Sequence, residues 1–112
     1  MKVAGLIDDL FFTSKLREVA QALGAEAVIC RSADAVPPDV SRIFVDLSAS
    51  TLDPIAEIAK IKAGHSAPIT AFFSHVQIDM KERAERAGAD EVVPRSVFAS
   101  KLAEIIKSGT GR

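Results

Sequence analysis

Three aspartates stand where apolar segments of this sequence end. Asp8 and Asp9 follow the apolar run 3–7, and Asp46 follows the buried-strand pattern Arg42-Ile43-Phe44-Val45. In an open parallel sheet, ligands bind outside the carboxyl ends of the strands, at the point where the strand order reverses. Carboxylates gathered at such an edge indicate a site for a cation or for a phosphoryl group. Neither a glycine-rich phosphate loop nor a nucleophile elbow is present in the sequence.

The elements that must position these aspartates follow from the hydrophobic pattern. Segments of helical periodicity alternate with short, nearly continuous apolar runs, as is typical of parallel strands covered on both faces. The predicted strands are Lys2–Ile7, Ala27–Cys30, Arg42–Leu47, Ile69–Phe73 and Glu91–Val93. We therefore predict an α/β fold: a three-layer, flavodoxin-like, doubly wound sheet of five parallel strands in the order 2-1-3-4-5.

The connection between the second and third strands is unusually short. Residues 31–41 include Pro37-Pro38 and leave room for at most one helical turn, starting at Ser32, so the second helix is predicted to be truncated. Parallel sheets are normally covered on both faces. We therefore expect either an apolar patch around residues 27–29, covered by a partner or a second copy, or an extended lid formed by Val36–Val40.

Composition limits the class of protein. The chain has 112 residues, enough for one domain (predicted over residues 1–108, with a frayed tail over 109–112), and it is 48% hydrophobic and 26% charged. A net charge of −1, the lack of a polybasic block and the absence of Trp and Tyr argue against a nucleic-acid surface. No apolar run approaches the ~20 residues of a membrane span. One cysteine, Cys30, fits a buried position in a cytoplasmic protein.

Over its whole length the sequence resembles the receiver domains of bacterial two-component response regulators. Val45-Asp46-Leu47, followed by Leu52-Asp53-Pro54, is similar to the phosphoacceptor strand of that family and the loop after it. Ala67-Pro68-Ile69-Thr70-Ala71 is similar to the start of the fourth strand, and Arg86-Ala87-Gly88-Ala89-Asp90-Glu91 to the "AGADD" segment before the fifth. These segments occur in the order and at the spacing of the family.

The resemblance implies a chemistry. Asp46 would take a phosphoryl group from a histidine kinase, and Mg²⁺ held by Asp8 and Asp46 would neutralise the oxygens, with Asp9 at an often acidic neighbouring position. Arg95 stands at the position of the lysine that pairs with the phosphoryl group. Ser74 lies one residue after the position of the hydroxyl that senses it. This is nucleophilic catalysis by a carboxylate with charge stabilisation.

Several positions depart from the family pattern. The acidic pair after the first strand falls on Ile7 and Asp8, so one acid is lost, and the sensing hydroxyl falls on Phe73. The aromatic switch position falls on Val92, and Ser96 replaces the proline after the lysine, so the Arg95–Ser96 bond is expected to be trans. With one acid lost, Arg95 is an alternative to Mg²⁺ as the group that neutralises Asp46.

These observations predict a stand-alone receiver-like signalling domain of a phosphorelay, with Asp46 as phosphoacceptor. It would act by binding a histidine kinase or another signalling protein, or as a homodimer, with no nucleic-acid or membrane partner. It would be no enzyme beyond self-phosphorylation. The alternative is a phosphorylation-independent pseudo-receiver that serves as an interaction or dimerisation module. A third hypothesis is a small-ligand binder or enzyme on a flavodoxin-like scaffold.

Overall fold

The strands form one parallel sheet, as predicted. The computed structural model describes residues 1–74 and 78–109. Its strands are β1 (Lys2–Leu6), β2 (Glu26–Ile29), β3 (Arg42–Asp46), β4 (Ile69–Phe73) and β5 (Glu91–Pro94). They pair in parallel in the order β2-β1-β3-β4-β5, which confirms the predicted topology. The predicted strand ends differ from these by at most one residue.

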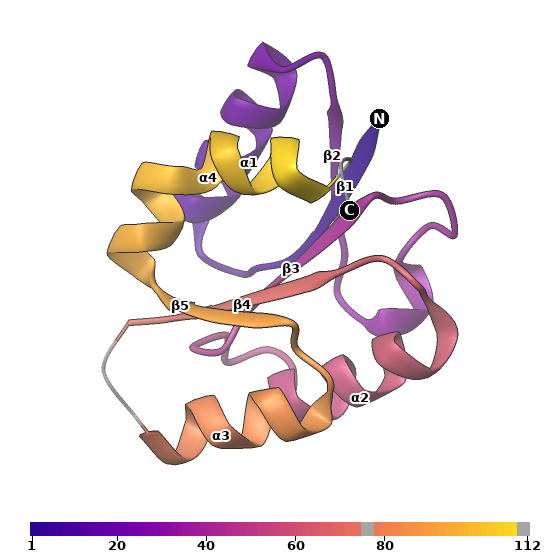
Figure 1. Ribbon diagram of the computed structural model, residues 1–112, viewed down its shortest axis with the longest axis vertical. Helices are drawn as coiled ribbons and strands as arrows, with labels where there is room; N and C mark the ends of the chain where they lie inside the picture. The colour runs from indigo at the N-terminus through magenta and orange to yellow at the C-terminus, as the bar shows by residue number, and fades with distance from the viewer. Residues whose placement is uncertain (75–77, 110–112) are drawn as a thin grey trace.

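Helices cover both faces of the sheet. They are α1 (Leu10–Ala22), the single 3₁₀ turn η1 (Ala33–Ala35), α2 (Pro54–Gly64), α3 (Ile78–Ala87) and α4 (Arg95–Gly109). Figure 1 shows α1 and α4 on one face and α2 and α3 on the other, which gives the three predicted layers. No helix within the described residues is long and apolar enough to cross a bilayer.

Some of the predictions from the sequence concern residues at the ends of helices or outside the described part of the chain. Helix α4 continues through Ser108 and Gly109, so the predicted tail is helical at its start, and residues 110–112 lie outside the described part of the chain. The charged segment Gln77–Ala87 predicts the third helix, and its first residue lies outside the described residues. His75, which the sequence predicts to be a surface residue, also lies outside them. The helix is described from Ile78 onward.

Local signals explain where α1 and α2 begin. The side chain of Asp9 accepts a hydrogen bond from the Phe12 backbone N–H (3.1 Å), and Asp53 caps α2 in the same way, with Pro54 at the first helical position. Both caps satisfy N–H groups that have no partner inside the helix. Helix α1 is followed by Gly24, whose φ of +75° is the left-handed conformation that favours glycine.

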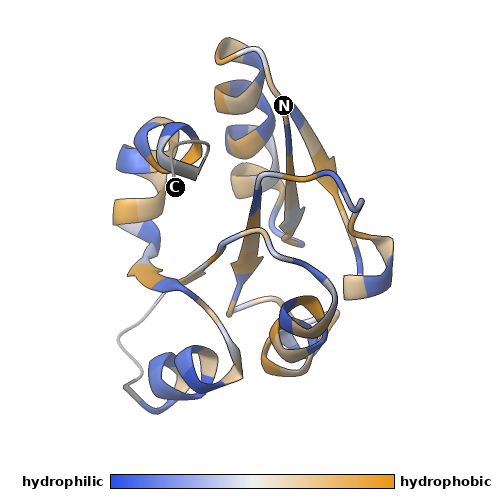
Figure 2. Cartoon of the chain, turned by 45° about the vertical axis from the view of Figure 1, so that its right-hand side comes forward, coloured by the Kyte–Doolittle hydropathy of each residue, from blue (hydrophilic) through white to orange (hydrophobic). Residues whose placement is uncertain are grey.

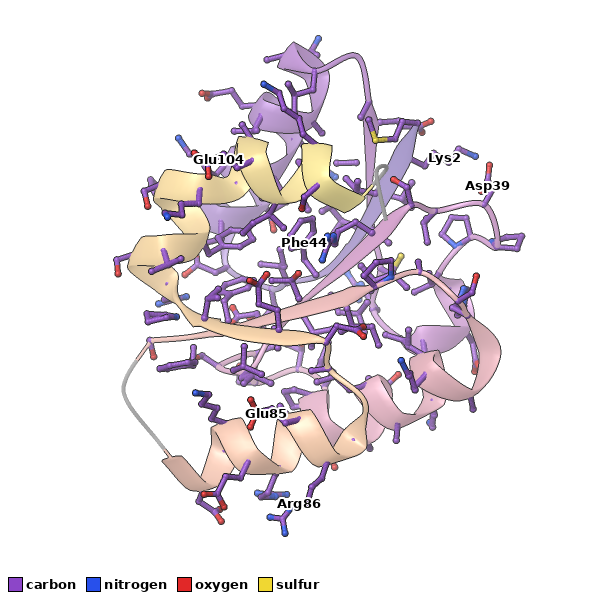
Figure 3. The ribbon with its side chains drawn as sticks, in the orientation of Figure 1. Lys2, Asp39, Phe44, Glu85, Arg86 and Glu104 are labelled. Carbon is purple, nitrogen blue, oxygen red and sulfur yellow. The ribbon has the colours of Figure 1, made fainter. Side chains whose placement is uncertain are left out.

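The side of the sheet that faces α1 and α4 is filled mainly by phenylalanine. Phe12, Phe44, Phe72 and Phe98 are all buried, and the Phe72 and Phe98 rings stack with centroids 4.0 Å apart. Phe44 lies in the interior between the sheet and α4 (Figure 3). Truncating such a residue to alanine typically costs about 3–5 kcal/mol. This layer therefore fixes the first turns of α1 and α4 against the carboxyl ends of the strands.

The other face of the sheet has an aliphatic core. Ile58 and Ile61 of α2 pack there against Ile43, Val45 and Ile69 of the sheet, and α3 adds the small, fully buried Ala84 and the partly buried Met80 and Ala87. Figure 2 shows α3 mostly in the blue of hydrophilic residues. The apolar side chains that hold α3 to the sheet therefore come from one face of a mostly hydrophilic helix.

Helix α1 lies unusually close to β1 because residue 5 is glycine. A Cβ atom at Gly5 would come within 2.8 Å of Cδ2 of Leu16, closer than real side chains approach. The absence of a side chain therefore lets α1 settle onto the strand, which carries the N-terminus of α1, with Asp9, to the carboxyl edge of the sheet.

The short connection between β2 and β3 forms the lid rather than leaving an apolar patch. Val36 and Val40 are buried in the aliphatic core together with Cys30, and Val28 packs against the same cluster. Of the two predicted alternatives, the structure therefore has the lid, because the connection, although too short for a helix, supplies its own apolar side chains.

Polar contacts hold this lid at both ends. The backbone N–H of Ala33 donates to the buried Glu57 of α2 (2.7 Å), and Asp39 pairs with Lys2 at the start of β1 (3.2 Å; Figure 3). The first contact is buried and the second is exposed, so the first contributes more to stability.

The opposite, amino edge of the sheet is tied to α4 by a buried arginine. Arg42, placed in a predicted apolar strand, donates from Nη1 to Thr70 Oγ1 (2.9 Å) and from Nη2 to Ser108 Oγ (3.3 Å). A cation beside the last turn of a helix also interacts favourably with the helix dipole. Arg42 therefore fixes the C-terminal turn of α4, as Phe98 fixes the first.

Candidate functional site

Asp46 is the most buried acidic group at the carboxyl edge of the sheet. It is the last residue of β3, and only 1% of its surface is exposed. Its Oδ1 atom accepts a hydrogen bond from the Ser48 backbone N–H (2.8 Å). Among the described residues, no donor forms a hydrogen bond with Oδ2. The side chain therefore holds one oxygen in place and leaves the other available.

The charge of Asp46 is balanced by opposing effects. Burial raises the pKa of Asp46 above its ordinary value, and the Ser48 N–H and the Arg95 charge act against this. The neighbouring charges of Asp8 and Asp9 raise the pKa further. A buried carboxylate needs a compensating partner, and the only cation paired with Asp46 within residues 1–74 and 78–109 is Arg95.

Arg95 is the first residue of α4 and follows β5 directly. Its Nη2 atom lies 3.7 Å from Asp46 Oδ2 and donates to Asp9 Oδ2 at 3.1 Å. The guanidinium carbon lies 4.4 Å from the centroid of the Phe12 ring, a cation–π arrangement. The Arg95 guanidinium therefore contacts three side chains: Asp46 at the end of β3, and Asp9 and Phe12 at the start of α1. The Arg95–Ser96 peptide is trans, as predicted, since the described residues include no cis bond.

Asp8, which the sequence predicts as a metal ligand, contacts the loop between β3 and α2. Its Oδ2 atom accepts hydrogen bonds from the backbone N–H groups of Ser50 (2.9 Å) and Thr51 (3.1 Å) and from the Thr51 hydroxyl (3.1 Å). Burial raises the pKa of Asp8, but these hydrogen bonds together outweigh it and lower the pKa below its ordinary value. Asp8 therefore clamps the loop between β3 and α2.

Phe73 ends β4 and Ser74 follows it, where the family pattern has its sensing hydroxyl. Ser74 Oγ lies 3.0 Å from Ser48 Oγ, so Ser74 contacts the residue whose N–H holds Asp46, and among the described residues it forms no hydrogen bond with Asp46 itself. Phe73 is half-buried and packs against the aliphatic core on the α2 and α3 side, as expected for a packing residue. The strand end thus turns Ser74 toward the rim of the site.

The sequence predicted that Asp46, Arg95, Asp8 and Asp9 belong to one site. It did not predict two contacts of Arg95, those with the Asp9 carboxylate and the Phe12 ring. Asp9 was expected mainly as a helix cap, yet its second oxygen is the shortest ionic contact of Arg95. Phe12 was expected only as a core residue, and it also supports the guanidinium. Its place in the first turn of α1, three residues after the Asp9 cap, is the one signal that could have suggested this.

The donor set does not fit Mg²⁺ as it is arranged here. Asp8 Oδ2 is taken by the 50–51 loop, both oxygens of Asp9 have partners, and Asp46 Oδ2 faces the Arg95 guanidinium. A divalent ion about 4.5 Å from that guanidinium would be repelled by roughly 7 kcal/mol at an effective dielectric of ~20. The described residues also include no group of three or more His, Cys, Asp or Glu side chains able to hold a metal.

Apolar surface flanks the acidic groups. Leu10 and Phe11, in the first turn of α1, are 84% and 66% exposed, and a cavity of about 350 Å³ lies between Leu10, Asp8 and the end of β2 at Ile29. This cavity therefore opens beside Asp8, and neither Asp46 nor Arg95 lines it.

Comparison with known proteins shows what this fold is. No family model matches the sequence, and no curated protein matches it. Among solved structures, a two-component response regulator from Clostridium difficile has a TM-score of 0.86 at 16% identity, over 100% of this chain and 97% of that one. The signal receiver domain of a DNA-binding response regulator protein (merR) from Colwellia psychrerythraea 34H has a TM-score of 0.83 at 18% identity, over 100% and 99%. A response regulator from Thermotoga maritima has a TM-score of 0.80 at 13% identity, over 99% and 98%. The chain therefore has the receiver-domain fold of two-component response regulators.

Proposed function

We propose that this chain is a receiver-like signalling domain that accepts a phosphoryl group on Asp46 and acts by binding a protein partner. The observation that carries the proposal is the state of the Asp46 side chain. It is buried at the carboxyl end of β3, its Oδ1 is fixed by Ser48, and its Oδ2 has no hydrogen-bond donor among the described residues while a guanidinium lies 3.7 Å away.

The residues present can support one reaction. Asp46 Oδ2 attacks the phosphorus of a phosphodonor, a new P–O bond forms an acyl phosphate, and the bond to the leaving group breaks, with its electron pair departing on that group. Arg95 exchanges Asp9 for the phosphoryl oxygens and neutralises their charge. The Ser48 N–H holds the carboxylate in its reactive orientation.

The partner side of the proposal follows from the reaction class. A histidine kinase is the natural donor, and the output is a changed affinity for another signalling protein or for a second copy. The domain is not an enzyme beyond this self-phosphorylation. A buried, unpaired Cys30 suits a reducing cytoplasm. Nucleic acid and membranes are not among the proposed partners.

One observation favours the phosphorylation-independent alternative. Arg95 already neutralises Asp46 without a phosphoryl group, and Phe73 and Val92 stand where a hydroxyl and an aromatic switch would read the modification. A ligand shifts an equilibrium only by its differential affinity for the two states. If Asp46 is not modified, the same fold serves as a pseudo-receiver, an interaction or dimerisation module.

The test is phosphoryl transfer from acetyl phosphate, followed by intact mass, with MgCl₂ in one arm and EDTA in the other. We expect a gain of one phosphoryl mass in the wild type and none in Asp46→Asn. Asp53→Asn, which changes an exposed helix cap, is the matched control and should be modified like the wild type. No mass gain in the wild type would leave the pseudo-receiver as the function, and a gain that survives in Asp46→Asn would place the site elsewhere.

A further inference from the structure

The carboxyl edge combines three acidic side chains with one fixed cation. We propose that Arg95 is a built-in counter-ion that excludes divalent cations from this pocket, and that its removal frees the oxygens of Asp9 and Asp46 that it now engages for such a cation. The inference deepens the proposed function by stating how its site is neutralised. It rests on that function only in taking this pocket as the functional one, since cation binding is measured without any phosphodonor.

The first step is that Arg95 is held firmly. The Asp9 carboxylate binds the guanidinium at 3.1 Å, the Phe12 ring supports its face at 4.4 Å, and Asp46 lies at 3.7 Å. Only 28% of the side chain of Arg95 is exposed. Three residues further along α4, Phe98 is fully buried and anchors the turn that carries Arg95. A planar guanidinium fixed by a carboxylate and an aromatic face is well suited to replace an ion.

The second step concerns the oxygen atoms that a cation would use. Asp46 Oδ2 is buried and has no hydrogen-bond donor among the described residues, so it points into the pocket with only the Arg95 charge opposite it. Asp9 Oδ2 is occupied by the same guanidinium. Hard divalent cations prefer carboxylate oxygens and water. The two oxygens that face the pocket are thus both engaged by Arg95.

The third step is the effect of removing that charge. With Arg95 present, its single positive charge lies 3.1 Å from the Asp9 carboxylate and 3.7 Å from the Asp46 carboxylate. Without Arg95, the buried Asp46 would have no cationic partner within the described residues. A buried charge without a partner is strongly unfavourable, so the empty pocket would gain from binding a divalent cation, which the Arg95 side chain now prevents.

The experiment compares wild type, Arg95→Gln and Arg83→Gln. Arg83 is exposed on α3, so its replacement changes net charge by the same amount far from the pocket. Mg²⁺ affinity is measured by calorimetric titration and by the unfolding temperature in MgCl₂ against EDTA. Mn²⁺ then locates the ion through paramagnetic broadening of the amide signals of Asp8, Asp9 and Asp46.

We expect at least tenfold tighter Mg²⁺ binding in Arg95→Gln than in the wild type or Arg83→Gln, with broadening confined to the pocket and lost in Arg95→Gln/Asp46→Asn. Arg95→Met, which keeps an apolar contact with Phe12, gives the same comparison if Arg95→Gln does not fold. Equal Mg²⁺ affinity in wild type and variant, or no binding in either variant, would overturn the proposal. Phosphorylation of Asp46 is scored separately by mass, so either idea can fail without the other.

Discussion

Replacing Asp46 by asparagine should stabilise the protein near neutral pH. The substitution keeps the shape of the side chain and an oxygen that can accept the Ser48 N–H bond at the Oδ1 position. It removes a negative charge that is almost fully buried and that Asp8 and Asp9 oppose. Arg95 loses one partner but keeps the closer one, Asp9 at 3.1 Å, so no bare cation is left in the pocket.

The size of the effect follows from the linkage between ionisation and folding. Burial, the leading cause, raises the pKa of Asp46 in the folded protein, so the folded state holds the ionised form less well than the unfolded state does. Each unit of such a difference corresponds to about 1.4 kcal/mol once the group is ionised. The substitution also removes the attraction between Asp46 and Arg95, and this loss lowers stability. We expect a net gain of about 1–2 kcal/mol, typical of stabilising changes at functional sites, and a rise in unfolding temperature of roughly 4–8 °C.

The stability gained through Asp46→Asn should depend on pH, and the direction of that dependence tests the cause. Because the folded pKa lies above the unfolded value of 3.8, the contribution of Asp46 to wild-type stability is fully present below that value and is lost as pH rises through the folded pKa. Urea unfolding of both proteins at neutral and acidic pH should therefore show a gain from Asp46→Asn that shrinks toward acid. A loss of stability at neutral pH would mean that the attraction of Arg95 outweighs burial. A gain that is independent of pH would have a cause other than ionisation.

Two further perturbations test the contacts that shape the site and the lid. Asp8→Asn should weaken the clamp on the 50–51 loop by less than about 1 kcal/mol, because the group is largely exposed. Since the pKa of Asp8 is lowered in the folded protein, urea unfolding should show this loss in full above the unfolded pKa of 3.8, and the loss should disappear as the pH falls through the lower folded pKa; an equal loss at neutral and strongly acidic pH would refute the charge argument. Glu57→Ala should cost about 1–3 kcal/mol by leaving the buried Ala33 N–H without its acceptor and should speed amide exchange across the lid, whereas Glu57→Gln keeps an acceptor and should lose less.

Local signals predicted much of the fold. Continuous apolar runs located all five strands, and the Asp9 and Asp53-Pro54 caps located the starts of α1 and α2. These features depend on residues within a few positions of one another. The pairing of Asp9 with Arg95 joins residues 86 positions apart, and Asp46 lies against the same cation. Spacing alone could place Arg95 near Asp46 but could not decide which acid it would bind most closely.

The lid shows a second limit. The length of the 31–41 segment predicted the loss of the second helix, and a single 3₁₀ turn is what forms. Whether this segment would cover β2 depended on Val36 and Val40 reaching the core and on Glu57, from a different helix, accepting the Ala33 N–H. Such a contact between distant segments has no local signature, so the sequence left the patch and the lid as equal alternatives.

Two departures from the receiver pattern, at Ile7 and Arg95, alter the charge and the shape of the pocket. Where the pattern has an acid, Ile7 is 4% exposed and packs in the phenylalanine-rich core, so one ligand of a metal ion is replaced by an apolar contact that holds α1. Losing an acid lowers the negative charge that must be neutralised, and a guanidinium fixed by Asp9 and Phe12 supplies positive charge at the same place. An arginine and the lysine of the family pattern carry the same single positive charge, so of these two departures only the lost acid changes the charge of the pocket. What the guanidinium adds is its planar shape, which lets it contact the Asp9 and Asp46 carboxylates and the face of the Phe12 ring at once, while Asp46 stays buried.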